Sequence, residues 1–407
     1  VSHGFLHFHH RKDNISTLYH LCVEPNQRRR GIGRQLIEAW ENNSRDNGIT
    51  TLRLKCPVDL QANGFYSRIG FKRVGIEPGK HRSLVVWEKN VLLNAPTKPQ
   101  FITSLSTGPK EIENLKKLWQ KNQNYCPYDP FQKVLYSPLS SPISTTDYLK
   151  TEKEANRIST VWIDCGAYQV QQGKFEYEEL LAFLKKFYQN NQWADGYVLP
   201  DLVPLSTDSD ERVEEKVQAT IYHCCYFFKQ MPIYIQKRAI APIQGRTINQ
   251  IYRCLENYAK MGVTRIGFGS WGTSGPNGSV NMLSTRSLDL FKKIYLFARE
   301  HRMELHCFGI GGPQSYNRFR NHHIIPHSLD STTWWKAGGF GSIFFPNTSQ
   351  IQVTVKRGLK TTKKGLEQLK KETNHSCYYC QDIDSLRTNR DHRIMHNLAA
   401  WLETLEL

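Results

Sequence analysis

The sequence predicts a protein of two α/β domains, in which a small α/β unit precedes a closed barrel of parallel strands. First, a length of 407 residues exceeds one ordinary core, because single domains usually hold about 100–200 residues. Second, short apolar segments alternate with amphipathic helices from Arg157 onward, and this alternation indicates a parallel sheet. Third, the number of repeats favours closure of that sheet into a (β/α)8 barrel of the TIM type.

Residues 1–92 form the first predicted unit, a compact α/β domain. Its one clear helix is expected over Gly33–Asp46, where apolar residues recur at helical spacing. Its strands are predicted from short alternating segments at Gly4–His9, Leu18–Val23, Thr51–Cys56 and Leu84–Glu88.

Residues 93–154 are interpreted as a linker that leads into the barrel. Ala95–Gln100 carries two prolines and has no apolar period, which is typical of a linker. Ser137–Ser144 is a second polar segment rich in Pro and Ser and is expected at the surface. Neither segment has a catalytic pattern.

Residues 155–407 are assigned to the barrel and a C-terminal metal-binding part. The predicted strands are Thr160–Ile163, Gly196–Leu199, Ala239–Ile243, Arg265–Phe268, Leu305–Phe308 and Ile343–Phe345. The predicted helices are Tyr177–Gln189, Asp210–Lys229, Thr247–Met261 and Thr285–His301.

Polar residues and glycines follow the predicted strands. They are Asp164, Asp201, Gln244, Gly267 with Gly269, and Gly309 with Gly311, and Asp330 follows a poorly defined strand. An aspartate in such a place is often only a helix cap, and paired glycines often only mark a turn. The carboxyl ends of barrel strands converge on one face, so we expect these residues to form one active site.

The charge balance favours a polyanionic partner. Fifty-four Lys and Arg against 37 Asp and Glu give a formal net charge of +17, which favours nucleic acid over membrane. No segment approaches the ~20 apolar residues that cross a bilayer, and the first ten residues lack the apolar core of a signal peptide. The ten cysteines lie mostly in apolar segments, so reduced thiols and a cytoplasmic location are expected.

A glycine-rich turn lies between a predicted strand and the helix of the first unit. Arg28-Arg29-Arg30-Gly31-Ile32-Gly33 resembles the R-x-x-G-x-G acyl-CoA loop of GNAT-type N-acetyltransferases, and the segment Asn63–Phe71 resembles their later Tyr-x-x-x-Gly-Phe element. The resemblance implies that Arg28, Gly31 and Gly33 cradle the CoA pyrophosphate of acetyl-CoA at the helix N-terminus.

The same resemblance makes Tyr66 the acid that protonates the leaving thiolate. The first strand and helices of that family would precede Gly4, so a truncated acetyltransferase domain is expected. The alternative is a remnant or docking domain in which the arginines only contact phosphate.

An ordered series of motifs in the barrel resembles the tRNA-guanine transglycosylase superfamily. Asp164-Cys165-Gly166-Ala167-Tyr168-Gln169 is similar to its D-S-G-G-F-Q element. Asp201, Ile243-Gln244-Gly245, Gly267-Phe268-Gly269, Phe308-Gly309-Ile310-Gly311 and Asp330-Ser331 follow in the order of that family. The resemblance covers roughly residues 155–400 and implies a zinc-containing barrel that exchanges a guanine base in nucleic acid.

The chemistry of base exchange explains these residue types. A carboxylate below the sugar can trap an oxocarbenium-like state covalently, and Asp330 is the candidate nucleophile. Asp164 is the candidate general acid and base, because burial at a strand end would raise its pKa.

Recognition of the base is assigned to the remaining polar positions. Asp201 and Gln244 fit the N–H donors and the carbonyl of a guanine-like ring. Gly267 and Gly269 would let backbone amides approach the ring, while Tyr168 could stack on its face and Gln169 completes the set.

Four residues near the C-terminus have metal-ligand chemistry. His375, Cys377, Cys380 and His396 supply two sulfur and two nitrogen donors around a Cys-x-x-Cys pair, and zinc takes such sets tetrahedrally in structural sites. His375 stands where the transglycosylase pattern has its first cysteine, and His392 is an alternative ligand. A redox role for the cysteine pair is the weaker interpretation, because no strand-helix context precedes it.

A basic segment lies just before the predicted metal site. Its cations are Lys356, Arg357, Lys360, Lys363, Lys364, Lys370 and Lys371. Charge runs are often only solvated helix faces, but phosphate contact is favoured here because of the strong net charge.

DNA is favoured over tRNA as the polymer. Asp330 is followed by Ser-Thr-Thr-Trp-Trp, whereas the tRNA-acting relatives have a Pro-Thr-Arg segment, and no RNA-binding appendage follows the metal site. This departure resembles the branch that places 7-deazaguanines, of the cyano-substituted type, in DNA. Two further hypotheses are an acetyltransferase delivered to nucleic acid by the barrel, and a non-catalytic zinc-containing nucleic-acid binder.

Overall fold

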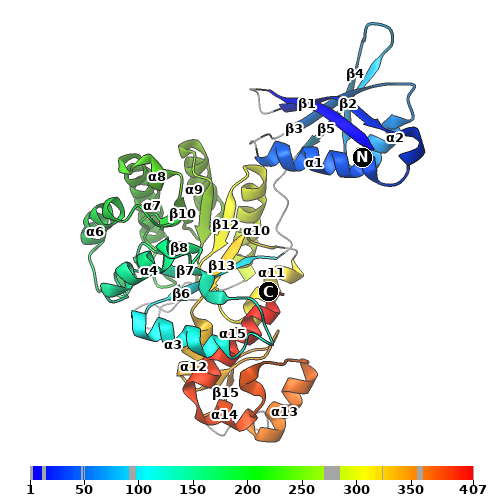
Figure 1. Cartoon of the computed structure of the whole chain (residues 1–407). Coiled ribbons are helices and arrows are strands. Elements are labelled where there is room, and N and C mark those ends of the chain that lie inside the picture. Colours follow the sequence, from blue (N-terminus) through cyan, green and yellow to red (C-terminus); the bar gives the residue numbers. More distant parts are fainter. Residues whose placement is uncertain are drawn as a thin grey trace. The chain divides into compact units, whose positions relative to one another are not determined.

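The computed structural model describes residues 3–11, 15–46, 49, 51–90, 98–269, 285–322, 324–354 and 361–406. The chain divides into two compact units, Val1–Asn94 and Ala95–Leu407. Figure 1 shows each unit with its helices and strands. Each unit is described by itself below.

The N-terminal unit contains a five-stranded sheet in the order β1-β2-β3-β5-β4. Its strands are β1 (Gly4–His10), β2 (Ile15–Val23), β3 (Thr51–Pro57), β4 (Lys72–Glu77) and β5 (Leu84–Asn90). Its helices are α1 (Ile32–Asp46) and α2 (Ala62–Arg68). The four predicted strands and the long helix are present, and β4 and α2 are additional to the prediction.

Strands β2 and β3 of this unit pair over only part of their length. They are parallel neighbours from Ile15 with Thr51 to Leu18 with Leu54, and no pairing continues beyond that point. The last residues of β2 therefore diverge from those of β3 beside the turn that begins α1.

The C-terminal unit is a closed barrel of eight parallel strands, in the cyclic order β6 to β13. The strands are β6 (Gln100–Leu105), β7 (Lys133–Tyr136), β8 (Thr160–Ile163), β9 (Gly196–Val198), β10 (Ala239–Ile243), β11 (Arg265–Phe268), β12 (Glu304–Cys307) and β13 (Ser328–Ser331). Ladders such as that from Ser328 with Gln100 to Ser331 with Thr103 close the barrel between its last and first strands. The predicted α/β barrel is therefore confirmed.

Helices follow the strands and cover the outside of the barrel (Figure 1). They are α3 (Pro109–Gln120), α4 (Ser144–Glu154), α5 (Ala167–Gln171), α6 (Tyr177–Asn190), α7 (Asp210–Gln230), α8 (Ile233–Gln236), α9 (Ile248–Met261), α10 (Thr285–Glu300), α11 (Pro313–Asn321) and α12 (Thr333–Gly339). Local sequence sets their ends: the Thr247 hydroxyl accepts from the Gln250 amide at the start of α9, and Gly262 ends that helix with φ of 82°.

The barrel begins earlier in the chain than the sequence analysis places it. Residues 93–154, interpreted as a linker, contain the barrel strands β6 and β7 and the helices α3 and α4. The polar segment Ser137–Ser144 follows the carboxyl end of β7, so it lies at the same end of the barrel as the predicted site residues.

One predicted barrel strand is wrong. Ile343–Phe345 was expected to join the barrel, but Ser342–Ile343 (β14) pairs with Ile351–Gln352 (β15) in a separate two-stranded sheet. The segment is apolar because it is buried against the C-terminal helix, and not because it belongs to the barrel. Strands β6 and β7, which were not predicted, belong to the barrel instead.

The C-terminal part packs around one almost fully buried helix. It contains α13 (Lys363–Glu372), a 3-10 turn at Tyr378–Cys380, α14 (Ile383–Thr388) and α15 (Arg390–Thr404). Asn397 of α15 accepts from the Phe344 amide at 3.0 Å and donates to the carbonyls of Trp334 and Ser342 at 3.2 and 3.1 Å. This helix therefore ties β14 to α12. No helix in the described residues has the length and apolar character to span a membrane.

Candidate active site and metal cluster

Four of the predicted site residues come together at the carboxyl end of the barrel. Asp164 follows β8, Asp201 follows β9, Gln244 follows β10, and Asp330 lies within β13. Asp201, Gln244 and Asp330 are buried at 5%, 4% and 4% exposure, and Asp164 keeps intermediate exposure. The Asp164 carboxyl lies close enough to Asp201 and Asp330 for their negative charges to raise its pKa.

Asp201 is the centre of a buried hydrogen-bond group. Gln244 donates from Nε2 to Asp201 Oδ2 at 2.5 Å, and the Cys165 thiol donates to Oδ1 at 3.1 Å. Neighbouring barrel strands place all three side chains, since β9 pairs with both β8 and β10. Cys165 was not predicted as a site residue, although the same hexamer carries it.

The carboxyl groups differ in their proton affinity. Burial, followed by the negative charges of Asp201 and Asp330, raises the pKa of Asp164 to about 7. Burial raises the pKa of Asp201 to about 6, although the hydrogen bonds from Cys165 and Gln244 act in the opposite direction. Near neutral pH these two carboxyl groups are therefore partly protonated, whereas solvent-exposed aspartates would be ionised, and Asp164 has the higher pKa of the two.

Asp330 is held by two donors on one of its oxygens. The Gly309 amide donates to Oδ1 at 2.8 Å, and His306 Nε2 lies 3.2 Å from the same atom. Gly309 adopts φ of 59°, a left-handed conformation that glycine takes without strain. His306 was missed by the sequence analysis, where its only signal is a lone polar residue within an apolar strand.

Tyr168 and Lys336 lie at the rim of this site. Tyr168 of α5 is 39% exposed, and the Lys336 ammonium of α12 lies 5.9 Å from its ring centroid. Gly166, with φ of 84°, starts the turn that presents α5. Lys336 was also missed, because its proximity to Tyr168 depends on closure of the barrel.

Two glutamines in this region have a buried oxygen without a partner. Gln244 Oε1 and Gln169 Oε1 accept no hydrogen bond from the residues that the structure describes. A buried acceptor without a donor costs about 1–3 kcal/mol, so these atoms are candidates for contact with a ligand that carries N–H groups.

Gly267 of β11 and Gly269 just after that strand leave space for a neighbouring ring, which the sequence did not indicate. A Cβ at Gly267 would lie 2.1 Å from the Phe308 ring, and one at Gly269 would lie 3.0 Å from Phe308 Cβ. The absence of side chains at these positions therefore admits Phe308. Their predicted role in backbone approach to a base stays a prediction.

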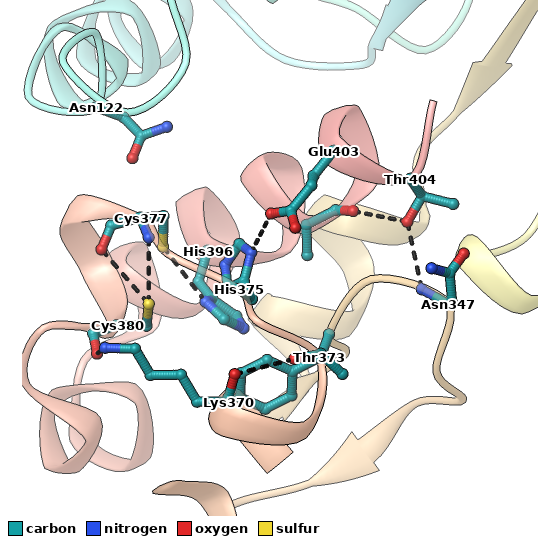
Figure 2. Close-up of polar contacts among 12 residues, drawn as sticks. Asn122, Asn347, Lys370, Thr373, His375, Cys377, Cys380, His396, Glu403 and Thr404 are labelled. Atoms are coloured by element: carbon teal, nitrogen blue, oxygen red, sulfur yellow. Dashed lines mark hydrogen bonds and ion pairs between the residues drawn. The ribbon is translucent and has the colours of Figure 1, made fainter. Parts of the chain in front are cut away.

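His375, Cys377, Cys380 and His396 form a buried cluster (Figure 2). One ligand atom from each residue lies within 4.8 Å of all the others. The cysteines flank a 3-10 turn, and His396 projects from α15, where its Nδ1 lies 3.5 Å from Cys377 Sγ. His392 is not part of the cluster, because its Nδ1 bonds the Ser385 hydroxyl at 2.9 Å.

The chemistry of this cluster fits a thiolate-binding metal such as zinc. The hydrogen bond from the Cys377 thiol, aided by His375 and His396, lowers the pKa of Cys380 well below its ordinary value. His375 Nδ1 contacts Glu403 Oε2 at 2.5 Å, while the Nε2 atoms of His375 and His396 are buried without a partner among the described residues. A carboxylate behind a histidine ligand and two sulfur donors are typical of structural zinc sites.

The predicted basic segment is only partly described. Lys356, Arg357 and Lys360 lie outside the described residues. Lys363 pairs with Asp384 at 3.0 Å, and Lys370 donates to the Cys380 carbonyl at 2.7 Å. Lys370 thus supports the metal-binding turn, and phosphate contact by the exposed Lys364 and Lys371 stays a prediction.

The predicted acyl-CoA residues of the N-terminal unit lie around the start of α1. Arg28 is exposed and donates from Nε to the Val23 carbonyl at 3.2 Å. Gly31 has φ of 84° and open space where a Cβ would be, and Gly33 lies in the first turn of the helix. This turn leaves backbone amides without helical partners, as an anion site requires.

Tyr66 of α2 lies beside the diverging ends of β2 and β3. Burial, and then the neighbouring Cys56 and Cys22, raises the pKa of Tyr66 to about 12. The phenol therefore stays protonated at neutral pH, which is the form that a general acid needs.

Comparison with known proteins bears on the N-terminal unit. Residues 4–85 match the model of the acetyltransferase (GNAT) domain, so this unit is a GNAT-like domain. That match ends before the barrel begins. None of the curated proteins matches the chain.

Several solved structures are similar to about a fifth of the chain. They include a GNAT-family acetyltransferase of Desulfovibrio desulfuricans (20% identity, 22% of this chain, 61% of that chain, TM-score 0.21). A second is the ribosomal-protein-S18-alanine N-acetyltransferase of Escherichia coli, with 21% identity over 23% of this chain and 64% of that chain and a TM-score of 0.20. A third is an aminoglycoside 6'-N-acetyltransferase complexed with coenzyme A, with 18% identity over 22% of this chain and 66% of that chain and a TM-score of 0.20. The chain spans about three-fifths of the length of the first of these proteins.

Removal of the metal donors should destabilise the C-terminal part. We expect the purified chain to carry about one zinc ion, and Cys380→Ser to lose it and to lower the thermal midpoint by roughly 5 °C or more. Metal content by mass spectrometry and thermal unfolding measure both effects. Cys225→Ser, at a half-buried cysteine outside the cluster, is the control. Equal metal content in both variants would contradict the assignment.

The raised pKa of Asp164 predicts a pH-dependent stability. The unfolded carboxyl ionises near pH 4, whereas the folded group keeps its proton to about pH 7. Folding stability therefore falls as pH rises from about 4 to 7. Asp164→Asn, which cannot ionise, should gain about 3 kcal/mol of stability relative to the native chain between pH 5 and pH 8.

Calorimetric unfolding at the two pH values measures this difference. Asp289→Asn, on the exposed side of α10, should have the same stability as the native chain at both. An Asp164→Asn effect that is independent of pH would show that Asp164 ionises normally in the folded protein.

Proposed function

We propose that the barrel is a guanine transglycosylase, which replaces guanine in nucleic acid by a 7-deazaguanine of the cyano-substituted type. The observation that carries the proposal is the group formed by the buried Asp201, Gln244 and Asp330 with the partly exposed Asp164 at the carboxyl end of the barrel. The ordered resemblance of these positions to the tRNA-guanine transglycosylase superfamily supports it. The activity needs two carboxyl groups of different proton affinity and a polar slot for a base.

The buried polar side chains suit a guanine-like ring. The N1–H and the amino group of guanine form an adjacent donor pair, which one carboxylate such as Asp201 can accept. The unpartnered Oε1 atoms of Gln244 and Gln169 offer further acceptors. Binding of the base would exchange the contact between Asp201 and Gln244 for contacts with the ring. The exposed ring of Tyr168 would stack on a base that has left its helix.

The proposed reaction has two displacement steps. Asp330 attacks C1′ of the nucleotide, the bond from C1′ to N9 breaks, and its electron pair leaves with guanine, which takes a proton from Asp164. The incoming deazaguanine then loses its N9 proton to Asp164 and attacks C1′, and the bond to Asp330 breaks. Asp164 ends the cycle protonated, and atoms and charge balance.

The metal ion is expected to have a structural role in this scheme. His375, Cys377, Cys380 and His396 would hold it with no position left for substrate. No reaction step passes through it.

Replacement of the nucleophile tests the proposal. We expect the native chain to incorporate labelled guanine into a polynucleotide, and Asp330→Asn to lose at least about a thousandfold of this rate, because an amide cannot trap the sugar. Asp289→Asn is the matched control on the outer face of the same barrel. Absence of exchange in every polynucleotide by the zinc-loaded chain would refute base exchange and favour a non-catalytic nucleic-acid binder.

DNA is the favoured polymer over tRNA in this proposal. The residues after Asp330 form α12 and bring Trp334 into the core and Lys336 to the rim. They leave no Pro-Thr-Arg segment of the kind found in tRNA-acting relatives. Parallel exchange assays with duplex DNA, single-stranded DNA and tRNA decide this point, and incorporation only into tRNA would reverse the preference.

A second activity is proposed for the N-terminal unit, because residues 4–85 match the GNAT domain. In this proposal acetyl-CoA binds across the divergence of β2 and β3, with its pyrophosphate at Arg28, Gly31 and Gly33. Tyr66 would protonate the leaving thiolate of CoA.

Charge reversal in the glycine-rich turn tests acetyl-CoA binding. Arg28→Glu should weaken binding at least about tenfold by calorimetry, since it places a carboxylate beside the pyrophosphate. Arg73→Glu on the exposed face of β4 is the control and should bind as the native chain does. No binding by the native chain, or equal binding by both variants, would refute this site.

A further inference from the structure

A chain of three buried polar side chains ends on Asp330. The Ser328 hydroxyl lies 2.8 Å from His306 Nδ1, and His306 Nε2 lies 3.2 Å from Asp330 Oδ1. Ser328, His306 and Asp330 are exposed by only 6%, 2% and 4%. Ser328 and Asp330 are two residues apart on β13 and so face the same side, while His306 comes from the neighbouring strand β12.

The partners of His306 indicate the tautomer that an ionised Asp330 requires. An ionised Asp330 has only acceptors, so the hydrogen between it and His306 must lie on His306 Nε2. The Gly309 amide donates to the same Oδ1 at 2.8 Å. Ser328 then completes the bonding of the imidazole at Nδ1. Both ring nitrogens of His306 are thereby engaged.

The aromatic neighbours of His306 restrict its ring. Trp162 and Phe308 lie edge-on to the imidazole, with ring centroids 4.9 and 4.5 Å away and interplanar angles of 67° and 72°. The two ring contacts and the bonds at both nitrogens restrict the orientation of the imidazole. It is therefore a rigid support for the carboxylate.

We propose that His306 is the positioning residue of Asp330, which turns Oδ2 toward the sugar by fixing Oδ1. The proposal rests on the proposed base exchange. In the described residues Oδ2 has no hydrogen-bond partner, so it is the oxygen available to form the bond to C1′. His306 itself does not touch the substrate in this arrangement.

A purely structural role for His306 gives a different expectation. If the residue only fills the barrel interior, its loss would lower stability without changing the rate per folded molecule. If it positions Asp330, loss of the Nε2 donor slows formation of the covalent adduct, and a residue that restores a donor at that place restores the rate.

Two substitutions separate these roles. In His306→Gln the amide nitrogen can occupy the place of Nε2, whereas His306→Leu has no donor. The probe is a guanine-containing oligonucleotide of the polymer that the native chain modifies, with formation of the denaturant-stable adduct followed in a single turnover. His306→Leu should slow this step about tenfold to a hundredfold, with oligonucleotide affinity unchanged. His306→Gln should retain the rate within about fivefold of the native chain.

Two outcomes would overturn the proposal. One is an unchanged rate in His306→Leu. The other is equal slowing in His306→Leu and His306→Gln when both are folded and loaded with zinc. Absence of any adduct in the native chain would refute the base exchange itself.

Nitrogen-15 histidine spectroscopy tests the contact without activity. The native chain should show His306 with hydrogen on Nε2, in slow exchange with solvent and sensitive to Asp330→Ala, whereas Asp289→Asn should leave the signal unchanged. A His306 without hydrogen on Nε2 would overturn the positioning role whatever the assays show.

Discussion

The crowding of carboxyl groups at one end of a closed parallel barrel is the constraint on which the candidate site depends. Closure of β6 against β13 forces the ends of all eight strands onto one face. Asp164, Asp201 and Asp330 therefore share a desolvated region in which like charges repel. The three groups have different neighbours. Asp330 and Asp201 receive hydrogen-bond donors from side chains, and burial with the neighbouring charges raises the pKa of Asp164 to about 7. A group of carboxyl side chains in which one has a raised pKa is suited to a reaction that needs both a nucleophile and an acid.

Helix α15 connects the cluster of His375, Cys377, Cys380 and His396 to the helix that follows Asp330. His396 supplies a cluster nitrogen, and the adjacent Asn397 bonds the carbonyls of Trp334 and Ser342. Trp334 lies on α12, the helix that directly follows Asp330. Arg393 of the same helix donates to the Gly338 carbonyl at the end of α12. A metal that fixes α15 would thus stabilise the position of α12 and Lys336 at the rim, although it takes no part in the chemistry.

Sequence patterns predicted the architecture where the local signals were strong. Strands such as Ala239–Ile243 are apolar, short and bounded by polar residues, and they appear as predicted. Strands β6 and β7 were not predicted. Strand β6 follows a proline-containing segment and is interrupted by Thr and Ser, which hides its apolar pattern. Ile343–Phe345 was misassigned because burial alone makes a segment apolar, and it does not reveal the partner strand.

Site residues, like strands, could be predicted where the local sequence carries the signal and not where the signal depends on distant contacts. The strand-end residues Asp164, Asp201 and Gln244 could be named in advance, since parallel strands carry their functional groups at one end. His306 and Lys336 could not, because their significance depends on contacts across the barrel with Asp330 and Tyr168. Among the cluster residues, His375 could be distinguished from His392 only when the fold around α15 was known.

Equilibrium binding of free guanine tests most directly whether this group of residues is a purine pocket. Dialysis of the zinc-loaded chain against radiolabelled guanine should retain one base per chain. Asp201→Asn should abolish that retention, because an amide cannot accept both donors of the ring, whereas Asp330→Asn should preserve it. Guanine bound equally by the native chain and Asp201→Asn, or not bound by the native chain at all, would contradict the proposed pocket.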